Sequence, residues 1–336
     1  MTAPFSTFGA FSACLATLPA ADGAARDAAR ARDAVLTKPP GALGRLEEVA
    51  IWAAGWRGER PRAERAQVIV FAGNHGVTAQ GISAFPAEVT AQMVANFETG
   101  GAAINQLCKV AGADLSVVPL DLEHPTADFT TAPAMGEEEC LAALNAGWDA
   151  VSPDYDVLVV GEMGIGNTTS AAALAAARFG GTGADWAGAG TGLDAAGQAR
   201  KAAVIDAGLA RHPGTSGVRA LAALGGRELA AMAGAIVRAR ELRIPVLLDG
   251  FICSAAAACL TAEAPDALDH CLAAHLSHEG GHAKLLKAMD LTPLLSLDLR
   301  LGEGSGAALA LPIYRAALAC HSDMASFADA GVAEKS

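Results

Sequence analysis

Residues 157–170, VLVVGEMGIGNTTS, decide how this chain folds. An apolar run over 157–160 is followed by a turn with three glycines and then by an alanine-rich segment. This order predicts a buried strand, a glycine-rich turn and a helix whose first backbone N–H groups can bind a phosphate. The turn is neither a P-loop, because it lacks Gly-Lys-Ser/Thr, nor a dinucleotide fingerprint, because GxGxxG is absent. The same residues would also suit an ordinary helix start capped by Asn167 or Thr168.

Strands and helices alternate in this way over residues 67–300, which predicts a parallel sheet covered by helices and therefore an α/β fold. Besides 157–160, the predicted strands are 67–72, 115–120 and 244–248. Helices are predicted in the first 60 residues, from about 87, over 102–110, after 170, around Arg200 and Lys201, after 226, and at the C-terminal end over about 307–320.

The composition argues against several classes of partner. The chain has 336 residues, of which 52% are hydrophobic, as is typical of a protein with a buried core. A formal net charge of -12 without a basic cluster argues against nucleic acid or an anionic membrane as the partner. The seven cysteines form no CxxC pair, which is typical of reduced thiols. No cationic region precedes Arg26 and no apolar run is long enough to span a membrane, so we expect a cytoplasmic protein.

A single carboxylate, Glu303, lies among glycines in LGEGSG, residues 301–306. The alternating leucines of 295–301 predict a strand that ends in this turn. Ligands of α/β sheets bind beyond the carboxyl ends of strands, so Glu303 would be placed to act as a base, although a solvated loop glutamate has the same pattern. The glycines would let a flat ligand approach closely. Phe85 and Met93 could hold such a ring between them, although residues at this spacing are more often ordinary core.

Polar residues at other turns are further candidates for ligand contacts. His75 follows the predicted strand 67–72 and could be an acid, a base or a side chain that stabilises its turn. Asp249 is likewise polar at the end of a predicted strand. Lys38 or Arg45 could reach an anionic ligand, although their proline- and glycine-rich stretch also suits a simple turn between helices.

The sequence HEGGH, residues 278–282, matches the HExxH pattern of zinc proteases. That pattern needs a helix, and two consecutive glycines each disfavour a helix interior by about 1 kcal/mol. We therefore expect a glycine-rich loop in which Ser277, His278 and nearby amides could meet a phosphate or a ribose hydroxyl.

Six motifs, in this order and spacing, resemble the nicotinate-nucleotide:dimethylbenzimidazole phosphoribosyltransferase family, which makes the lower-ligand nucleotide of cobalamin. The motifs are TKPPGALG (37–44), FAGNHGV (71–77), GEMGIGNTT (161–169), GTG (190–192), DGF (249–251) and LGEGSG (301–306). The resemblance covers nearly the whole chain. The sequence departs from the family at Asn74, where members commonly have aspartate, and members vary around 83–86, so the reaction type is better specified than the acceptor base.

The resemblance implies a homodimer whose subunit has a Rossmann-like α/β catalytic domain over 63–307. A small helical domain would be assembled from both chain ends, 1–62 and 308–336. The substrates would be small molecules, nicotinate mononucleotide and a benzimidazole, and no metal or organic cofactor is expected.

The resemblance also implies which residues carry the chemistry. Glu303 matches the family base, Glu162 matches a second carboxylate of the phosphoribosyl site, and Lys201 matches a site lysine. The binding residues fall into two groups that surround the benzimidazole and the nucleotide. The benzimidazole group is Phe85, Met93, Met163 and Leu301, and the nucleotide group is Gly164, Asn167 and Ser277. The glycine-rich turn and the strand end add Thr168 and Asp249 as further binding candidates.

The expected reaction transfers the phosphoribosyl group of nicotinate mononucleotide to 5,6-dimethylbenzimidazole, giving nicotinate and α-ribazole 5′-phosphate. Three alternatives stay open at the level of the sequence. The same transfer could use another base or a phenol as acceptor, the chain could be a zinc hydrolase that uses His278 and His282, or it could be a nucleotide-binding protein without catalysis.

Overall fold

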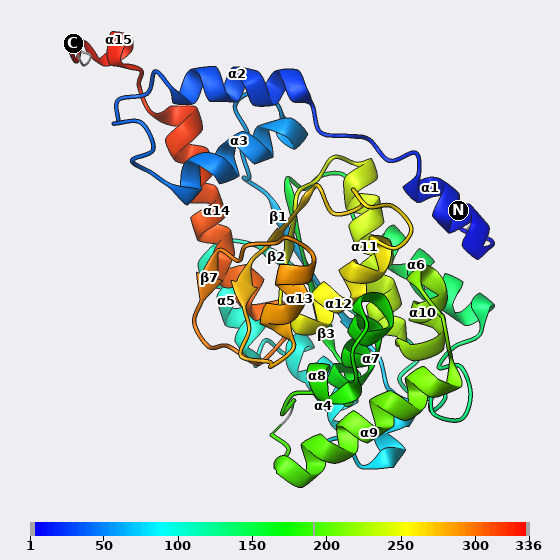
Figure 1. Cartoon of the computed structure of the whole chain (residues 1–336). Coiled ribbons are helices and arrows are strands. Elements are labelled where there is room, and N and C mark those ends of the chain that lie inside the picture. Colours follow the sequence, from blue (N-terminus) through cyan, green and yellow to red (C-terminus); the bar gives the residue numbers. More distant parts are fainter. Residues whose placement is uncertain (1–3, 191, 334–336) are drawn as a thin grey trace.

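The structure, a computed structural model, describes residues 4–190 and 192–333 (Figure 1). At its centre is a five-stranded parallel sheet with the strand order β2-β1-β3-β4-β5. The strands are β1 (Ala66–Ala72), β2 (Asp114–Pro119), β3 (Val157–Met163), β4 (Val246–Leu248) and β5 (Cys271–Ala273). A second sheet pairs β6 (His275–Leu276) with β7 (Leu295–Ser296). The order of the central sheet reverses between β1 and β3, and such a switch point is where α/β sheets bind ligands.

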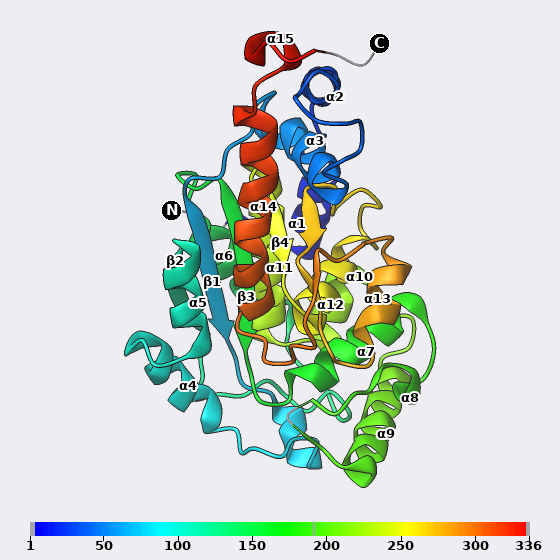
Figure 2. The same cartoon turned by 90° about the vertical axis from the view of Figure 1, so that its left-hand side faces the viewer.

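Helices cover both faces of the central sheet (Figures 1 and 2). They are α1 (Phe8–Leu15), α2 (Gly23–Asp33), α3 (Arg45–Arg57), the 3-10 helix η1 (Gly76–Gln80), α4 (Val89–Glu98), α5 (Ala103–Ala111), α6 (Glu137–Ala150), α7 (Asn167–Phe179), α8 (Gly183–Trp186), α9 (Ala195–Arg211), α10 (Gly217–Leu224), α11 (Arg227–Glu241), α12 (Phe251–Leu260), α13 (His282–Ala288), α14 (Ser305–Asp323) and α15 (Phe327–Ala330). Within the described ranges, no helix combines the length and the hydropathy that a membrane crossing requires.

The alternation of side chains along the strands creates two cores. In β1, Ile69 and Phe71 face one core together with buried residues of α6, α7, α11 and α12. Val68 and Val70 face the other core together with buried residues of α3, α5 and α14. Because strands buried on both faces need apolar residues at every position, β1 is a continuous apolar run except for Gln67. Figure 2 shows α14 lying along one face of the sheet.

The four predicted strands of the central sheet are confirmed, as is the parallel, helix-covered architecture. The sequence analysis did not predict β5 or α6. Strand β5 has only three residues, which is too short for a periodic pattern. Helix α6 buries alanine, glycine and asparagine as well as leucine, so its apolar face is weakly marked in the sequence.

The prediction of a strand over 295–301 is wrong beyond its first two residues. Only Leu295–Ser296 is a strand, and it belongs to the small second sheet. Leu297 and Leu301 are 55% and 56% exposed, so their alternation does not reflect burial in a sheet. Leu299 and Leu301 instead form part of a cavity wall, which needs apolar side chains without a strand.

Helices α2 and α3 from the N-terminal part of the chain pack with the C-terminal half of α14 at one end of the molecule (Figure 1). Arg32 donates hydrogen bonds to the carbonyls of His321, Ser322 and Met324. Leu36 forms an isolated antiparallel bridge with Ser326. Helix α1 packs elsewhere, against α10. The division of the chain at 62/63 and 307/308 stays a prediction.

Helices α6 and α11 approach each other closely because both have glycine at the contact. A Cβ on Gly147 would overlap the backbone carbonyl of Ala231, and a Cβ on Gly234 would overlap that of Leu144. A backbone carbonyl cannot rotate away as a flexible side chain can. Any side chain at either position must therefore push the two helices apart.

We expect Gly147→Ala to lower the free energy of unfolding by about 1–3 kcal/mol, because the added methyl group has no room. Gly23→Ala is the matched control, since a Cβ there meets no atom within 4 Å, and it should change stability by less than about 0.5 kcal/mol. Urea denaturation of both variants measures this. Equal stability of Gly147→Ala and the wild type would contradict the close approach of α6 and α11.

Candidate active site

A cavity of about 690 Å³ lies at the carboxyl ends of the central strands. Its walls come mainly from four segments of the chain, within 82–93, 162–168, 250–252 and 275–303. The second and third of these directly follow or end strands β3 and β4, next to the switch point of the sheet. The cavity thus occupies the position where ligands bind in folds of this class.

Of the twelve residues that the sequence analysis assigned to the phosphoribosyl and base sites, ten lie together around this cavity. They are Phe85, Met93, Glu162, Met163, Gly164, Asn167, Thr168, Ser277, Leu301 and Glu303. Lys201 and Asp249 do not line it. Each of these two is instead buried behind the wall and bound to residues next to the cavity.

Glu303 lies in a backbone turn that few residues can form. Its φ is 63°, and the glycines on either side, Gly302 and Gly304, have φ of 83° and 81°. Three consecutive residues in the left-handed region explain why two of them are glycine, and the glutamate itself is held at a cost of about 1–3 kcal/mol. Gly161 of β3 makes room for this turn, because a Cβ there would come within 2.5 Å of the Glu303 carbonyl carbon.

Asp249, which directly follows β4, holds the turn of Glu303 in place. Its carboxylate accepts hydrogen bonds from the backbone N–H of Gly304 (3.2 Å) and of Ala307 (2.9 Å). Asp249 thereby caps the start of α14, where a negative charge is also favoured by the helix dipole. Both of its oxygens are engaged behind the wall and it is only 2% exposed, so it positions this turn, and its direct contact with a ligand stays a prediction.

Glu162, near the end of β3, lies against the same turn. Its backbone carbonyl accepts the N–H of Glu303 (3.2 Å), and its side chain accepts a hydrogen bond from the Asn167 amide. A Cβ on Gly302 would overlap the Glu162 carboxylate, so the glycine lets the two carboxylate-bearing segments meet. Glu162 and Glu303 therefore face one cavity from neighbouring elements.

Both cavity carboxyls bind protons more strongly than usual. Burial, with smaller repulsion from Asp249, Glu228 and Glu303, raises the pKa of Glu162 to about 8. Burial, with smaller repulsion from Asp249, raises the pKa of Glu303 to about 7, although a nearby backbone N–H of Ile104 opposes this. One carboxylate oxygen of Glu303 is buried without a hydrogen-bond partner in the described structure. Such a group is well suited to accept a proton near neutral pH.

The part of the cavity wall where α7 begins has features of an anion site. Helix α7 begins at Asn167, and Thr168 in its first turn receives a hydrogen bond from the Lys201 ammonium (3.0 Å). Burial lowers the pKa of Lys201, opposed by the charge of Glu279. Gly190 lies beside the same ammonium, and its N–H is 3.2 Å from a Glu279 oxygen. The helix N-terminus and the lysine behind it provide positive potential for a phosphate.

Thr191, the middle residue of the GTG motif, lies outside the described residues.

Another part of the wall is apolar. Phe85, Met93, Met163 and Leu301 lie around it, with Phe85 53% exposed. Such a wall can cover both faces of a flat aromatic ligand, since aromatic and thioether groups pack well against rings.

The two histidines of HEGGH have different surroundings. The His282 side chain is buried, with Nδ1 accepting the Ser277 N–H (2.9 Å) and Nε2 at 3.1 Å from the Ser254 hydroxyl. The His278 side chain is 67% exposed and lies 3.8 Å from Asp298. Helix α13 begins only at His282, so the two histidines do not share a helical face. Within 4–190 and 192–333, no three His, Cys, Asp or Glu side chains are grouped so that they could hold a metal ion.

Two other cationic candidates lie away from the cavity wall. Lys38 is buried in ion pairs with Asp33 (2.9 Å) and Glu47 (3.0 Å), and Arg45 pairs with Glu48. The 36–47 stretch therefore forms a turn between helices, which is one of the two interpretations that its sequence allowed.

His275 lies in the cavity wall but was not identified from the sequence. Its side chain is 4% exposed, and its Nε2 is 3.5 Å from an Asp249 oxygen. His275 follows the short strand β5, which the sequence did not reveal, so no strand end pointed to it. Glu279 and Arg300 also line the cavity and were not identified.

Comparison with known proteins gives the same relationship over nearly the whole chain. Residues 18–332 match a family model described as phosphoribosyltransferase. The chain is 64% identical to the nicotinate-nucleotide–dimethylbenzimidazole phosphoribosyltransferase of Ruegeria pomeroyi, over 96% of this chain and 97% of that one. It is also 64% identical to the protein of the same name from Roseobacter denitrificans, over 99% and 100%. Among solved structures, CobT of Thermus thermophilus is 43% identical and superposes with a TM-score of 0.89, covering 93% of this chain and 100% of that one.

We expect Glu162→Gln to stabilise the protein at pH 8 more than at pH 5. Because the pKa of Glu162 is raised to about 8 in the folded state, the folded protein holds a proton that the unfolded chain has lost, and stability falls as pH rises from about 4.5 to 8. Glutamine removes this loss, which is on the order of a few kcal/mol. Urea denaturation at both pH values measures it, with exposed Glu98→Gln as control. An equal effect of Glu162→Gln at both pH values would contradict the raised pKa.

Proposed function

The chain belongs to the nicotinate-nucleotide–dimethylbenzimidazole phosphoribosyltransferase family, and we propose that Glu303 is the base of the transfer in the cavity described above. The enzyme transfers the phosphoribosyl group of nicotinate mononucleotide to 5,6-dimethylbenzimidazole for cobalamin synthesis. The observation that carries the assignment of Glu303 is its buried, unpartnered oxygen at a cavity wall, with a pKa of about 7.

The bond changes are simple. The bond between ribose C1′ and the pyridinium nitrogen breaks, and its electron pair neutralises that nitrogen, so nicotinate leaves without help from a metal. One nitrogen of the benzimidazole donates its lone pair to C1′ from the opposite face. The proton on the other ring nitrogen becomes acidic as positive charge builds on the ring, and Glu303 accepts it. The products are nicotinate, α-ribazole 5′-phosphate and one proton.

Glu162 has a different role in this proposal. Positive charge develops on the ribose while the old bond is breaking and the new bond is incomplete, and a nearby carboxylate stabilises such a charge. Glu162 lies next to Glu303 but is oriented by the Asn167 amide, which supports a fixed position beside the sugar. In this proposal the two neighbouring carboxylates act in the same reaction, Glu162 on the ribose and Glu303 on the acceptor base.

The nucleotide is held at the end of the cavity where α7 begins. Gly164, Asn167 and Thr168 line the cavity at this point and Ser277 lines it from a separate segment, and the helix N-terminus favours the phosphate. Lys201 is buried and bound to Thr168, so we assign it the role of orienting Thr168 and adding positive potential. The apolar wall of Phe85, Met93, Met163 and Leu301 then holds the flat base in line with C1′, and such alignment contributes much of a rate enhancement of this kind.

The same proposal includes a cytoplasmic homodimer with a catalytic domain over 63–307 and a helical domain from both chain ends. All seven cysteines are free thiols, which supports a reducing compartment. Val110 and Ile313, which are 82% and 39% exposed, lie on the neighbouring helices α5 and α14 and could meet a second subunit. The proposal needs no cofactor.

The first test incubates the protein with nicotinate mononucleotide and 5,6-dimethylbenzimidazole in the presence of a chelator, and follows nicotinate and α-ribazole 5′-phosphate by mass spectrometry. We expect both products in equal amounts. Nicotinate without the riboside phosphate would indicate hydrolysis or a different acceptor, and a panel of other benzimidazoles, adenine and phenols would then identify that acceptor. Binding of the nucleotide without either product would contradict the enzymatic assignment and favour a non-catalytic nucleotide-binding protein.

The second test is Glu303→Gln, which keeps the shape of the side chain and removes its ability to accept a proton. We expect kcat to fall by roughly 10²–10⁴-fold, as for loss of a positioned general base, while the protein keeps its affinity for the nucleotide. Glu98→Gln makes the same chemical change at an exposed site on α4 and should leave kcat unchanged. Normal turnover by Glu303→Gln would remove Glu303 from the chemistry.

A further inference from the structure

A buried histidine–glutamate pair lies directly beneath the glycine-rich turn of the cavity. His75 follows β1 and is 1% exposed, and Glu228 in the first turn of α11 is fully buried. The His75 Nε2 atom is 2.5 Å from a Glu228 oxygen, and its Nδ1 atom is 3.1 Å from the Ser170 hydroxyl. None of these three side chains lines the cavity. The turn-stabilising interpretation of His75 is therefore the one that the geometry favours over a direct acid or base.

The order Ser170, His75 and Glu228 resembles the relay of a serine hydrolase. In such enzymes the serine hydroxyl must be exposed to attack the substrate. Ser170 is fully buried within α7 and lies outside the cavity wall. The relay thus fixes the histidine ring and does not supply a nucleophile.

Three glycines create the space that the pair occupies. A Cβ on Gly73 would overlap a Glu228 oxygen, and a Cβ on Gly226 would overlap the imidazole of His75. A Cβ on Gly164, in the cavity wall, would lie 3.1 Å from the other Glu228 oxygen. The pair therefore contacts the backbone of the cavity turn without an intervening side chain.

The same glycine connects the pair to the carboxylate that faces the ribose. The position of a Cβ on Gly164 is also 3.3 Å from the Asn167 amide nitrogen, which donates to Glu162. Glu228 is thus connected to Glu162 through the Gly164 position and the Asn167 amide. Its negative charge contributes to the raised pKa of Glu162. It does so in a fully buried region, where charges are weakly screened.

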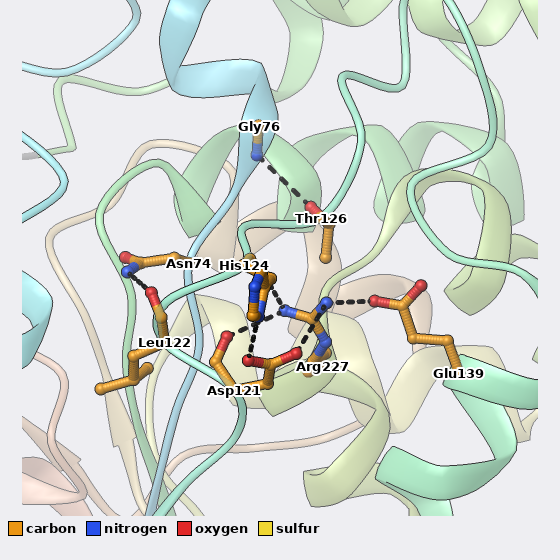
Figure 3. A network of polar contacts seen from close by, with 8 residues as sticks. All are labelled: Asn74, Gly76, Asp121, Leu122, His124, Thr126, Glu139 and Arg227. Atoms are coloured by element: carbon orange, nitrogen blue, oxygen red, sulfur yellow. Dashed lines mark hydrogen bonds and ion pairs between the residues drawn. The ribbon is translucent and has the colours of Figure 1, made fainter.

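An outer network holds the two residues that precede the pair in the sequence, Asn74 and Arg227 (Figure 3). Arg227, the residue before Glu228, forms hydrogen bonds with the carbonyls of Asp121 and His124 and an ion pair with Glu139. Asn74, the residue before His75, donates to the carbonyl of Leu122 (2.9 Å). The loop after β2 thereby ties the residue next to His75 to the residue next to Glu228.

One feature of the pair does not serve stability. The second Glu228 oxygen is buried without a hydrogen-bond partner within the part of the chain that the structure describes, and such an atom costs about 1–3 kcal/mol. A glutamine has the same shape and would carry no charge. Folding stability therefore does not explain why this position has a glutamate and not a glutamine.

We infer that His75 and Glu228 are a positioning pair for Glu162, which fixes the turn at Gly164 and sets the electrostatic potential at the ribose-facing carboxylate. This inference rests on the proposed function. The charged groups that face Glu162 are Asp249 after β4, which His275 contacts, Glu303 before α14, and Glu228 on α11, which His75 contacts. Of these, only Glu228 acts from beneath the glycine-rich turn.

The test is the pH dependence of kcat/KM for Glu228→Gln. Glu162 must be ionised to stabilise the ribose cation and Glu303 must be ionised to accept the proton, so the rate rises with pH and levels off only above the higher pKa, that of Glu162 at about 8. Loss of the Glu228 charge lowers that pKa, and we expect the rising limb to move to lower pH by about one pH unit. The KM for the nucleotide should change less than kcat. A limb at the wild-type position, with the rate reduced equally at all pH values, would overturn the inference and leave the pair as a fold element.

Three further variants separate the possible causes. Asp121→Asn weakens the outer network but leaves the charge of the pair, so its limb should stay at the wild-type pH. Glu228→Asp keeps the charge, so the rising limb of its kcat/KM profile should also stay at the wild-type pH. A limb shifted like that of Glu228→Gln would contradict an electrostatic effect.

If Glu228→Gln fails to fold, His75→Gln provides the test. The glutamine amide can still donate to Glu228 and keep that carboxylate ionised, so the rising limb should stay at the wild-type pH, and a limb moved to lower pH in that variant would overturn the inference. Absence of turnover in the wild type would instead be a failure of the proposed function.

Discussion

The two hydrogen bonds that Asp249 accepts from the start of α14 are the interaction on which the site depends. They fix the N–H groups of Gly304 and Ala307, and so they hold the turn that keeps Glu303 in a left-handed conformation. The aspartate comes from the end of β4 and the turn rests on Gly161 of β3. The position of the base is therefore set by the central sheet and not by the loop that carries it, which is how a strained residue can stay in one place.

The site gathers carboxylates where water cannot stabilise them. Asp249, Glu162, Glu228 and Glu303 are each 6% exposed or less, and burial is the largest cause of the raised pKa of both Glu162 and Glu303. This arrangement destabilises the free protein as pH rises. It also gives a base that is half-ionised near neutral pH and, once Glu162 has lost its proton, a negative site for a sugar that becomes cationic. The burial that raises the pKa of these carboxyls therefore also lowers the stability of the free protein, a trade-off that is common at active sites.

Much of the fold could be predicted from the sequence because β1, β3 and β4 consist mostly of apolar runs, as in 157–160, followed by turns that contain glycine. Glu303 could be found because glycines flank it. The leucines of 295–301 were misassigned because a cavity wall and a strand face need the same apolar side chains. The role of Asp249 and the pairing of His75 with Glu228 could not be predicted, because both depend on contacts between segments distant in sequence.

The protonation of Glu303 itself is the most direct test of its role as the base. Infrared difference spectra of the free wild-type protein minus Glu303→Gln, recorded from about pH 4 to about pH 9 so as to bracket the ordinary and the raised pKa, isolate the carboxyl stretch of this one side chain. We expect Glu303 to be half-protonated near pH 7, since its pKa is raised to about 7. Half-protonation near the ordinary value of about 4.3 would contradict this, because Glu303 would then be a solvated carboxylate with no special affinity for the proton of the acceptor base.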